Sequence, residues 1–316
     1  MEKVNIGVDV GGMSIKAGLV NYNGDILFKK SCVTDGKNVP KFLEDMKNLL
    51  KEVIEEGNKL NLEIGGIGFG VPGMVNNKLG TIDKMANISG RNIPLREYLA
   101  DLNLPIYISN DANVAALAEQ KFGAAKGYQD VILLTLGTGV GGGVICDGRL
   151  YEGNEGKGAE LGHVCLILNG RQCGCGRKGC LETYASASAL LRDTKEMMEE
   201  HKDSIMWEYA NNDINNVSGL TSFECAKKGD KWANEVIDNY VMYLGEGMLD
   251  FCNIFRPEVF VIGGGISNQG KYLTDKLQKY LEDHNYGYES APSSEVVVAK
   301  LKNDAGIIGA ASLLID

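Results

Sequence analysis

The feature that most constrains the fold of this chain is a unit of strand, glycine turn and strand that occurs twice. In the first copy, an apolar, β-branched run over residues 4–10 turns through Gly11-Gly12 into a second apolar run over residues 15–20. The second copy occupies residues 131–146 and turns at Gly137-Thr138-Gly139. Runs of this kind on either side of a short glycine turn predict paired strands, and the second unit looks like the first used again.

Strands and helices alternate along the rest of the chain. Further strands are predicted at residues 64–69, 106–109 and 259–262, and helices at 42–56, 182–200, 233–255 and after Asp304. This alternation indicates an α/β protein, and the hairpins make its sheets mixed rather than purely parallel. The length of 316 residues exceeds the usual size of one compact domain. We therefore expect two lobes that share a cleft.

The composition excludes several classes of partner. A formal net charge of −10 disfavours nucleic acid or an anionic membrane as the main ligand. The chain enters an apolar strand pattern at once, without the segments of a secretory signal, and no apolar run reaches membrane-spanning length. The eight cysteines do not form the pattern of a secreted disulfide framework. These observations predict a cytoplasmic protein.

Both glycine turns are candidate phosphate-binding loops. Glycine permits positive φ and close approach of the backbone, so that successive N–H groups can point at a phosphate chain. Asp9, just ahead of the first turn, is placed to hold Mg²⁺ directly or through water, because a hard cation prefers oxygen ligands. Each loop alone fits a tight hairpin turn equally well. Two such loops in corresponding positions favour phosphate binding.

A third glycine cluster, Gly263-Gly264-Gly265, follows a predicted strand and precedes a helix. It would allow a flat nucleoside to pack on the backbone, although a plain strand-to-helix turn explains it as well. The chain has no Gly-Lys-Ser or Gly-Lys-Thr of a Walker loop and no dinucleotide fingerprint after the first strand. Those two nucleotide-binding folds are disfavoured.

Asp111 is the candidate general base. It follows a short apolar strand and precedes an alanine-rich helix, where its carboxylate could accept a hydroxyl proton. On this motif alone, helix capping by Asp111 or Asn110 is the simpler interpretation. Glu160, His163 and Glu182 lie beside glycine-rich or cysteine-rich turns and could bind several hydroxyls of a sugar, although a surface position is the default for a glutamate.

Three cysteines and a histidine predict a metal site. Cys173, Cys175 and Cys180 fall within eight residues, and His163 lies ten residues upstream of the first. Three thiolates and one imidazole complete a closed tetrahedral zinc shell, and such a shell leaves no open position for water. The zinc is therefore predicted to be structural. It would fasten the loop that carries Glu160 and Glu182.

With these residues in place, the chain resembles the ROK family (repressors, open reading frames and kinases), most closely its bacterial glucokinases. The resemblance covers nearly the whole chain and rests on five motifs in the expected order. They are Asp9-Val10-Gly11-Gly12-Met13-Ser14, Asn110-Asp111, Leu136 to Gly143, Glu160-Leu161-Gly162-His163, and Cys173-Gly174-Cys175 through Gly179-Cys180-Leu181-Glu182.

The resemblance implies an actin-like fold with two ribonuclease-H-like lobes. The small lobe would span residues 1–110 and be completed by a C-terminal helix at 305–316, and the large lobe would span 111–304. The implied activity is ATP-dependent phosphorylation of the 6-hydroxyl of glucose, with Asp111 as base, Mg²⁺, structural Zn²⁺ and a homodimer. The implied sugar contacts are Asn87, Asn110, Asp111, Glu160, His163 and Glu182. The implied nucleotide contacts are Asp9, Gly11, Gly12, Ser14, Lys16, Gly137, Thr138, Gly139, Gly264 and Gly265.

One departure from the family pattern leaves alternatives open. The family usually has threonine after the first two glycines, whereas this chain has Met13, which cannot hydrogen-bond a phosphate. Alternatives are a kinase for N-acetylglucosamine or N-acetylmannosamine, a sugar-sensing protein without catalysis, and a kinase that uses polyphosphate. Family repressors carry an N-terminal helix-turn-helix segment, but here the hairpin begins at Val4. No DNA-binding module is expected.

Overall fold

The computed structural model describes residues 1–11, 14–85, 88–287 and 290–315. Contacts divide the chain into two compact units. Unit 1 comprises Met1–Leu133, Gly143–Ala159 and Lys300–Asp316, and unit 2 comprises Leu134–Gly142 and Glu160–Ala299. The functional lobe limits expected from the resemblance stay a prediction.

Unit 1 is built on a five-stranded mixed sheet. Its strands are β1 (Lys3–Val10), β2 (Ser14–Asn21), β3 (Ile26–Val33), β4 (Glu63–Val71) and β8 (Ile106–Asn110). The order is β3-β2-β1-β4-β8, with β1, β2 and β3 antiparallel and β1, β4 and β8 parallel. The first predicted hairpin and the mixed character of the sheet are confirmed. The prediction missed β3.

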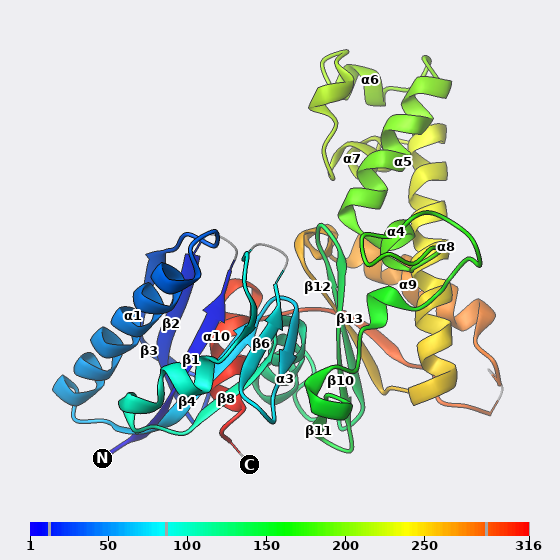
Figure 1. Cartoon of the computed structure of the whole chain (residues 1–316). Coiled ribbons are helices and arrows are strands. Elements are labelled where there is room, and N and C mark those ends of the chain that lie inside the picture. The colour runs from blue at the N-terminus through cyan, green and yellow to red at the C-terminus, as the bar shows by residue number, and fades with distance from the viewer. Residues whose placement is uncertain (12–13, 86–87, 288–289, 316) are drawn as a thin grey trace. The chain divides into compact units, whose positions relative to one another are not determined.

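Helix α1 (Val39–Lys59) covers one face of this sheet (Figure 1). The side chain of Asn38 accepts a backbone hydrogen bond at the start of the helix and satisfies one of its free N–H groups. Apolar residues at helical spacing, among them Phe42 and Met46, are fully buried in the same core as Ile6 of β1. Each such side chain contributes about 1.5–3 kcal/mol through burial, so this face is the main core of unit 1.

Helices α3 (Asp111–Phe122) and α10 (Ala305–Ser312) pack against each other, and α10 lies on the opposite face of the sheet. Their close approach needs glycine, because a Cβ at Gly309 would overlap the backbone carbonyl oxygen of Val114. Successive side chains of a strand point to opposite faces, so Asp9 of β1 lies on the α10 side. The expected C-terminal helix is confirmed and packs beside the start of α3.

A small antiparallel sheet lies between β4 and β8 in the sequence. Its strands are β5 (Met74–Asn76), β6 (Thr81–Lys84) and β7 (Arg91–Ile93), and α2 (Leu95–Tyr98) and η1 (Ala100–Leu102) follow. Arg96 donates to the carbonyl oxygens of Asn77 and Lys78 at 2.8 Å each and of Ile106 at 3.2 Å. This one side chain joins α2, the β5–β6 turn and β8.

A second five-stranded sheet contains the second predicted hairpin. Its strands are β9 (Val131–Leu136), β10 (Val140–Cys146), β11 (Arg149–Tyr151), β12 (Val259–Gly263) and β13 (Glu295–Val298). The order is β11-β10-β9-β12-β13, and β12 and β13 are parallel. Residues 134–142, which include the glycine turn, belong to unit 2. The short segments η2 (Asn154–Gly156) and η3 (Leu161–His163) follow β11.

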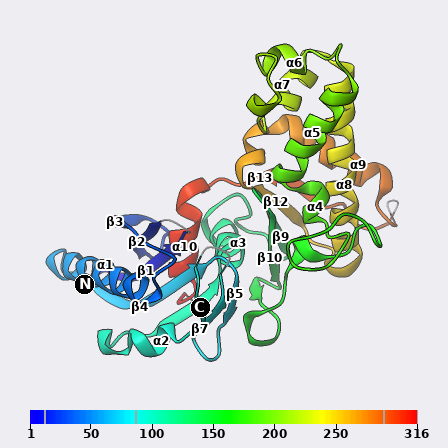
Figure 2. The ribbon, with the colours of Figure 1, turned by 45° about the horizontal axis from the view of Figure 1, so that its top comes forward.

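Unit 2 is otherwise largely helical. Its helices are α4 (Glu182–Ala185), α5 (Ala187–Glu200), α6 (Met206–Tyr209), α7 (Thr221–Lys227), α8 (Lys231–Phe255) and α9 (Lys271–His284), with η4 (Ile214–Asn216) and η5 (Gly265–Gln269) between them; η6 (Lys302–Asp304) precedes α10. Helix α8 contacts α4, α5, α7 and α9, and Figure 2 shows α5 and α7 beside it. Among the described residues, no helix is both long and apolar enough to cross a membrane.

The predicted helix over 182–200 is wrong in one respect, because it is two helices. Ser186 has an extended backbone, with φ −84° and ψ 166°, and ends α4 after one turn. Its hydroxyl oxygen accepts the N–H of Ala189 at 3.1 Å and caps α5. A serine between two apolar helical stretches is a start signal for the second helix. The break places Glu182 in a short helix of its own.

Candidate functional site

Asp9 and Lys16 face each other across the first hairpin. They are directly opposite in the β1–β2 pair, and Nζ of Lys16 lies 3.2 Å from Oδ2 of Asp9. The turn between the two strands is closed by the N–H of Gly11, which donates to the carbonyl oxygen of Ser14 at 2.8 Å. The side chain of Asp9 is 23% exposed, so solvent or a ligand can reach it. Gly12, another predicted phosphate contact, lies outside the described residues, as does Met13.

Asn110 and Asp111 stand at the junction of β8 and α3. Asn110 is the N-cap: its Oδ1 accepts the N–H of Ala112 at 2.8 Å, and its amide donates to the carbonyl oxygen of Gly73 at 3.0 Å. Oδ1 of Asp111 shares the same N–H at 2.9 Å. Because Asn110 already caps the helix, Oδ2 of Asp111 is not needed for capping. Asn87, the remaining sugar contact expected in this part of the chain, lies outside the described residues.

The surroundings of Asp111 favour its protonated form. Protein atoms around the carboxyl withdraw it from water and raise its pKa above the ordinary value. The hydrogen bond from Ala112 acts in the opposite direction, and the negative charge of Asp9 raises the pKa further. The residue nevertheless keeps an exposed surface. A carboxylate with a raised pKa that a ligand can reach is a better proton acceptor than an ordinary aspartate.

The second glycine turn is held by Glu182 and by the start of α5. The N–H of Val140 donates to Oε2 of Glu182 at 3.0 Å, and the carbonyl oxygen of Gly137 accepts the N–H of Ala187 at 2.8 Å. A Cβ at Gly139 would overlap the carboxylate of Glu182, so this position requires glycine. The loop and Glu182 therefore form one packed unit. Thr138, between the two anchor points, is exposed.

Glu160 and His163 lie at the two ends of one short turn. The N–H of His163 donates to the carbonyl oxygen of Glu160 at 3.0 Å. Glu160 is exposed, and His163 is partly buried because its ring faces the cysteines. The third predicted glycine cluster also adopts a special conformation: Gly264 has φ +79° and lies against the backbone of Leu136. Gly265, with no atom near its Cβ position, begins η5.

The predicted metal ligands are together in unit 2. One ligand atom from each of His163, Cys173, Cys175 and Cys180 lies within 4.8 Å of every other. Sγ of Cys175 and Sγ of Cys180 are 3.6 Å apart, and Sγ of Cys173 is 3.7 Å from Nδ1 of His163. Zinc–ligand bonds in a tetrahedron give sulfur–sulfur edges of about 3.8 Å and sulfur–nitrogen edges of about 3.6 Å. The donor set and its spacing fit zinc.

The chemistry of the three thiols also calls for a cation. Burial raises the pKa of Cys173 and, together with the neighbouring thiols, raises that of Cys180 to about 12. The pKa of Cys175 is lowered, first by the N–H of Arg177. Three adjacent thiolates cannot all be charged without a counter-ion, whereas Zn²⁺ binds thiolate ligands and neutralises them.

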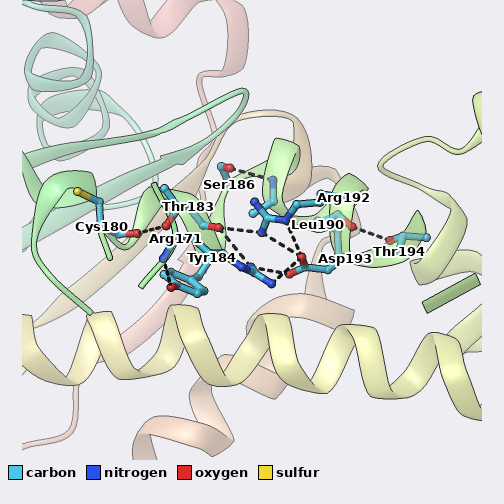
Figure 3. Close-up of polar contacts among 10 residues, drawn as sticks. Arg171, Cys180, Thr183, Tyr184, Ser186, Leu190, Arg192, Asp193 and Thr194 are labelled. Carbon is cyan, nitrogen blue, oxygen red and sulfur yellow. Dashed lines mark hydrogen bonds and ion pairs between the residues drawn. The ribbon is translucent and has the colours of Figure 1, made fainter. Parts of the chain in front are cut away.

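A polar cluster behind the cysteines was missed by the sequence analysis. Arg171, Arg192 and Asp193 meet beside the backbone of Thr183 (Figure 3). The three residues, which we call the Thr183 clamp, come from the start of the cysteine loop and from α5. No spacing rule connects a loop arginine with a helical aspartate 22 residues later. The only local signal was an Arg-Asp pair in a predicted helix.

The structure thus brings the predicted residues together in two groups. In unit 1 it gathers Asp9, Lys16, Asn110 and Asp111, and in unit 2 it gathers the second glycine turn, Glu182, His163 and the cysteines. Each group contains chemistry that a phosphoryl-transfer enzyme needs: a base with a carboxylate for a cation in one, and a phosphate loop with hydroxyl acceptors in the other.

Solved structures define the class of protein. A ROK family glucokinase from Streptomyces griseus, in complex with glucose and AMPPNP, matches with a TM-score of 0.80 and 33% identity, covering 98% of each chain. A ROK hexokinase from Thermus thermophilus matches with a TM-score of 0.79 and 30% identity, covering 98% of this chain and 96% of the other. The fold is the actin-like two-lobe α/β fold of these sugar-kinase structures.

Sequence comparison then identifies the family. A model of the ROK family matches residues 5–316. The glucokinase of Thermotoga maritima is 37% identical over 311 residues, covering 98% of this chain and 96% of the relative. A xylose repressor of Caldicellulosiruptor bescii is 31% identical over 314 residues, covering 98% of this chain and 77% of the relative. This chain belongs to the ROK family.

Proposed function

We propose that this protein is an ATP-dependent glucokinase that phosphorylates the 6-hydroxyl of glucose. The observation that carries the proposal is the match to the Streptomyces griseus glucokinase, which extends over nearly the whole of both chains and whose structure contains glucose and AMPPNP. All five family motifs retain their chemical residues in this chain except at Met13.

In the proposed reaction, Asp111 accepts the proton of the sugar hydroxyl as its oxygen attacks the γ-phosphate. The raised pKa of Asp111 and its exposed surface support this role. Asn110 would bind the sugar beside it while capping α3. Phosphoryl transfer depends mainly on positioning and charge screening, so a well-placed carboxylate is the main chemical group required of the protein.

The remaining sugar contacts are proposed at Asn87, Glu160, His163 and Glu182. Carboxylates can accept hydrogen bonds from adjacent hydroxyls, and each oxygen has two lone pairs. Oε2 of Glu182 already accepts the Val140 N–H, which leaves Oε1 and one lone pair of Oε2 for a ligand. His163 would contribute one ring nitrogen to zinc, because its Nδ1 is the atom that faces Cys173.

The nucleotide is proposed to contact the first turn with Lys16, the second turn, and the backbone at Gly264 and Gly265. Asp9 would hold Mg²⁺ directly or through water, and Mg²⁺, when bound, screens the phosphate charges. The cysteine cluster would hold structural Zn²⁺ and fasten the loop that ends at Glu182. We also propose lobes at residues 1–110 with 305–316 and at 111–304, and a cytoplasmic homodimer like that implied by the family resemblance.

A sugar panel in a coupled assay of ADP formation tests the function. Glucose, N-acetylglucosamine, N-acetylmannosamine, mannose and fructose are each assayed with ATP, with and without Mg²⁺. We expect glucose to have the highest kcat/KM and all turnover to require Mg²⁺. A higher kcat/KM for either amino sugar would contradict glucose as the substrate while leaving a ROK kinase in place.

A second candidate function is sugar sensing without catalysis. The full-length match to a xylose repressor and the presence of Met13 in the first phosphate turn favour it. Calorimetry separates the two candidates. Binding of glucose or xylose with no ADP formed from any sugar supports the sensor, whereas turnover of glucose rejects it.

A further inference from the structure

We propose that the Thr183 clamp, formed by Arg171, Arg192 and Asp193, positions Glu182 and thereby sets the affinity for sugar. The proposal rests on the proposed function, in which Glu182 contacts the sugar. It adds three residues that act through Glu182 without touching a ligand.

The clamp is organised by a two-pronged ion pair. Nη1 of Arg171 lies 3.1 Å from Oδ2 of Asp193, and Nη2 lies 3.0 Å from Oδ1 (Figure 3). Nε of Arg192 donates to Oδ1 of the same carboxylate at 2.9 Å. The side chains of Arg171 and Asp193 are 32% and 24% exposed. A partly buried bidentate pair fixes the orientation of both partners far better than a single exposed contact.

The two arginines hold the carbonyl oxygen of Thr183. Nη2 of Arg192 donates to it at 2.9 Å, and Nη1 of Arg171 approaches it at 3.4 Å. On the other side of the same residue, Oγ1 of Thr183 donates to the carbonyl oxygen of Cys180 at 2.7 Å. The peptide that directly follows Glu182 is therefore fixed by side chains from two separate elements.

Helix α4 needs this support because it is only one turn long. A four-residue helix has almost no stability of its own, since nearly all its N–H and C=O groups lack partners within the helix. Arg171 adds a further restraint: its N–H donates to the hydroxyl of Tyr184 at 2.7 Å, and its guanidinium stacks 4.7 Å from the centre of that ring. The backbone of α4 is thus held from outside.

Zinc and the clamp restrain opposite sides of Glu182. The metal would fix Cys180, two residues before it, and the clamp fixes Thr183, one residue after it. The free end of the side chain meets the Val140 N–H at 3.0 Å. If the clamp is lost, zinc still holds the cysteine loop, but the backbone at Glu182 can rotate. A change of about 1 Å in a binding group is enough to weaken its interactions substantially.

The test compares wild type with Arg171→Met and Asp193→Asn, which keep the size of each side chain but remove the ion pair. Glu199→Gln, an exposed change on the same helix, is the matched control. The measurements are KM for glucose and for ATP, kcat, zinc per chain, glucose binding by calorimetry, and hydrogen exchange of peptides covering 173–180 and 181–186. Arg171→Lys keeps the charge without the fork.

We expect each clamp variant to raise the KM and the dissociation constant for glucose about tenfold, and to leave the KM for ATP within about twofold. Zinc content and exchange at 173–180 should stay at wild-type values, whereas exchange at 181–186 should accelerate. Arg171→Lys should restore only part of the affinity because lysine cannot bind both carboxylate oxygens in plane. The double variant should lose little more than the worse single variant, since both remove one interaction.

Two results would overturn the proposal: unchanged exchange at 181–186 with unchanged glucose affinity, or loss of zinc in parallel with the rise in KM, which would make the network a support for the metal instead. A failure of the proposed function is distinguishable because it appears in wild type, as absence of glucose binding and turnover. In that case the exchange data still decide whether the clamp orders residues 181–186.

Discussion

Asp111 and Glu182 are the two carboxylates on which the proposed chemistry most depends, and they are held by different kinds of structure. Asp111 begins a 12-residue helix directly after a strand of a five-stranded sheet, and a glycine contact seats α10 against that helix. Glu182 begins a four-residue helix at the end of a cysteine-rich loop. Its support is a hydrogen bond to the glycine turn, the cluster of metal ligands and the Thr183 clamp.

The difference shows two solutions to fixing a polar group. Backbone hydrogen bonds and close packing place Asp111, so its position depends on the core of unit 1 and on no ligand or metal. Side chains and a metal site place Glu182, so its position can be changed by single substitutions that leave the core intact. The first solution is stable, and the second can be adjusted at less risk to folding.

Replacing Asp111 by Asn tests the chemical end of this comparison and has the largest expected effect. The amide cannot accept the hydroxyl proton, so kcat should fall by about 10²–10⁴-fold. The Ala112 N–H keeps its bond to Asn110, so the fold and the zinc content should be unchanged. Steady-state kinetics and zinc analysis check this, and a kcat near that of wild type in a folded, zinc-containing variant rules out Asp111 as the base.

Gly309→Ala attacks the packing that supports Asp111. The new Cβ would overlap the carbonyl oxygen of Val114, and neither backbone can move without disturbing α3 or the sheet. Overpacking of this kind should lower the free energy of unfolding by about 3 kcal/mol. Chemical denaturation measures it. Gly174→Ala in the cysteine loop, where no atom lies within 4 Å of the added carbon, is the control and should stay within about 0.5 kcal/mol. Equal effects of the two changes would contradict the comparison.

Cys175→Ser tests the metal that supports Glu182. Loss of one thiolate should release zinc and raise the KM for sugar about tenfold, because the loop before Glu182 loses its anchor. The core of unit 1 should unfold at an unchanged temperature. Cys165→Ser is the matched control, since Cys165 is exposed and close in sequence but outside the ligand group. Zinc retained by the Cys175 variant, or lost from the Cys165 variant, would show that the ligand set is wrong.

The same contrast explains what the sequence could and could not predict. Asp111, its strand and its helix follow from an apolar run, a cap signal and alternation, all of which are local. The thiol cluster was also predictable because four metal-ligand residues occur close together. The clamp was not, because Arg171 and Asp193 become neighbours only after the chain folds between them. Met13 and Asn87, on which two further expectations rest, lie outside the described residues.

Two features of the fold were missed for physical reasons. Strand β3 alternates buried and exposed residues weakly, so lysines at its exposed positions hide its pattern. The break at Ser186 depends on whether serine caps or continues a helix, and propensity alone does not decide this. The tertiary contact of Ala187 with the glycine turn favours the cap.

The pH dependence of Asp111 provides the smallest and most specific test of the comparison. Its pKa is raised in the folded protein, so activity should fall as the pH drops through that folded value, which lies above the ordinary 3.8. The sign for stability is opposite to that of a carboxylate with a salt bridge. Between the unfolded and folded pKa values the native state binds more protons, so this residue makes the protein less stable as the pH rises through that window. Asp111→Asn removes the cost, and its Tm should exceed that of wild type by about 1–2 °C at pH 7 and by less at pH 4. Thermal unfolding of both proteins across this range measures the difference. A Tm advantage that grows as the pH falls would mean that the carboxylate is stabilised by its surroundings, and Asp111 would then be a cap rather than a base.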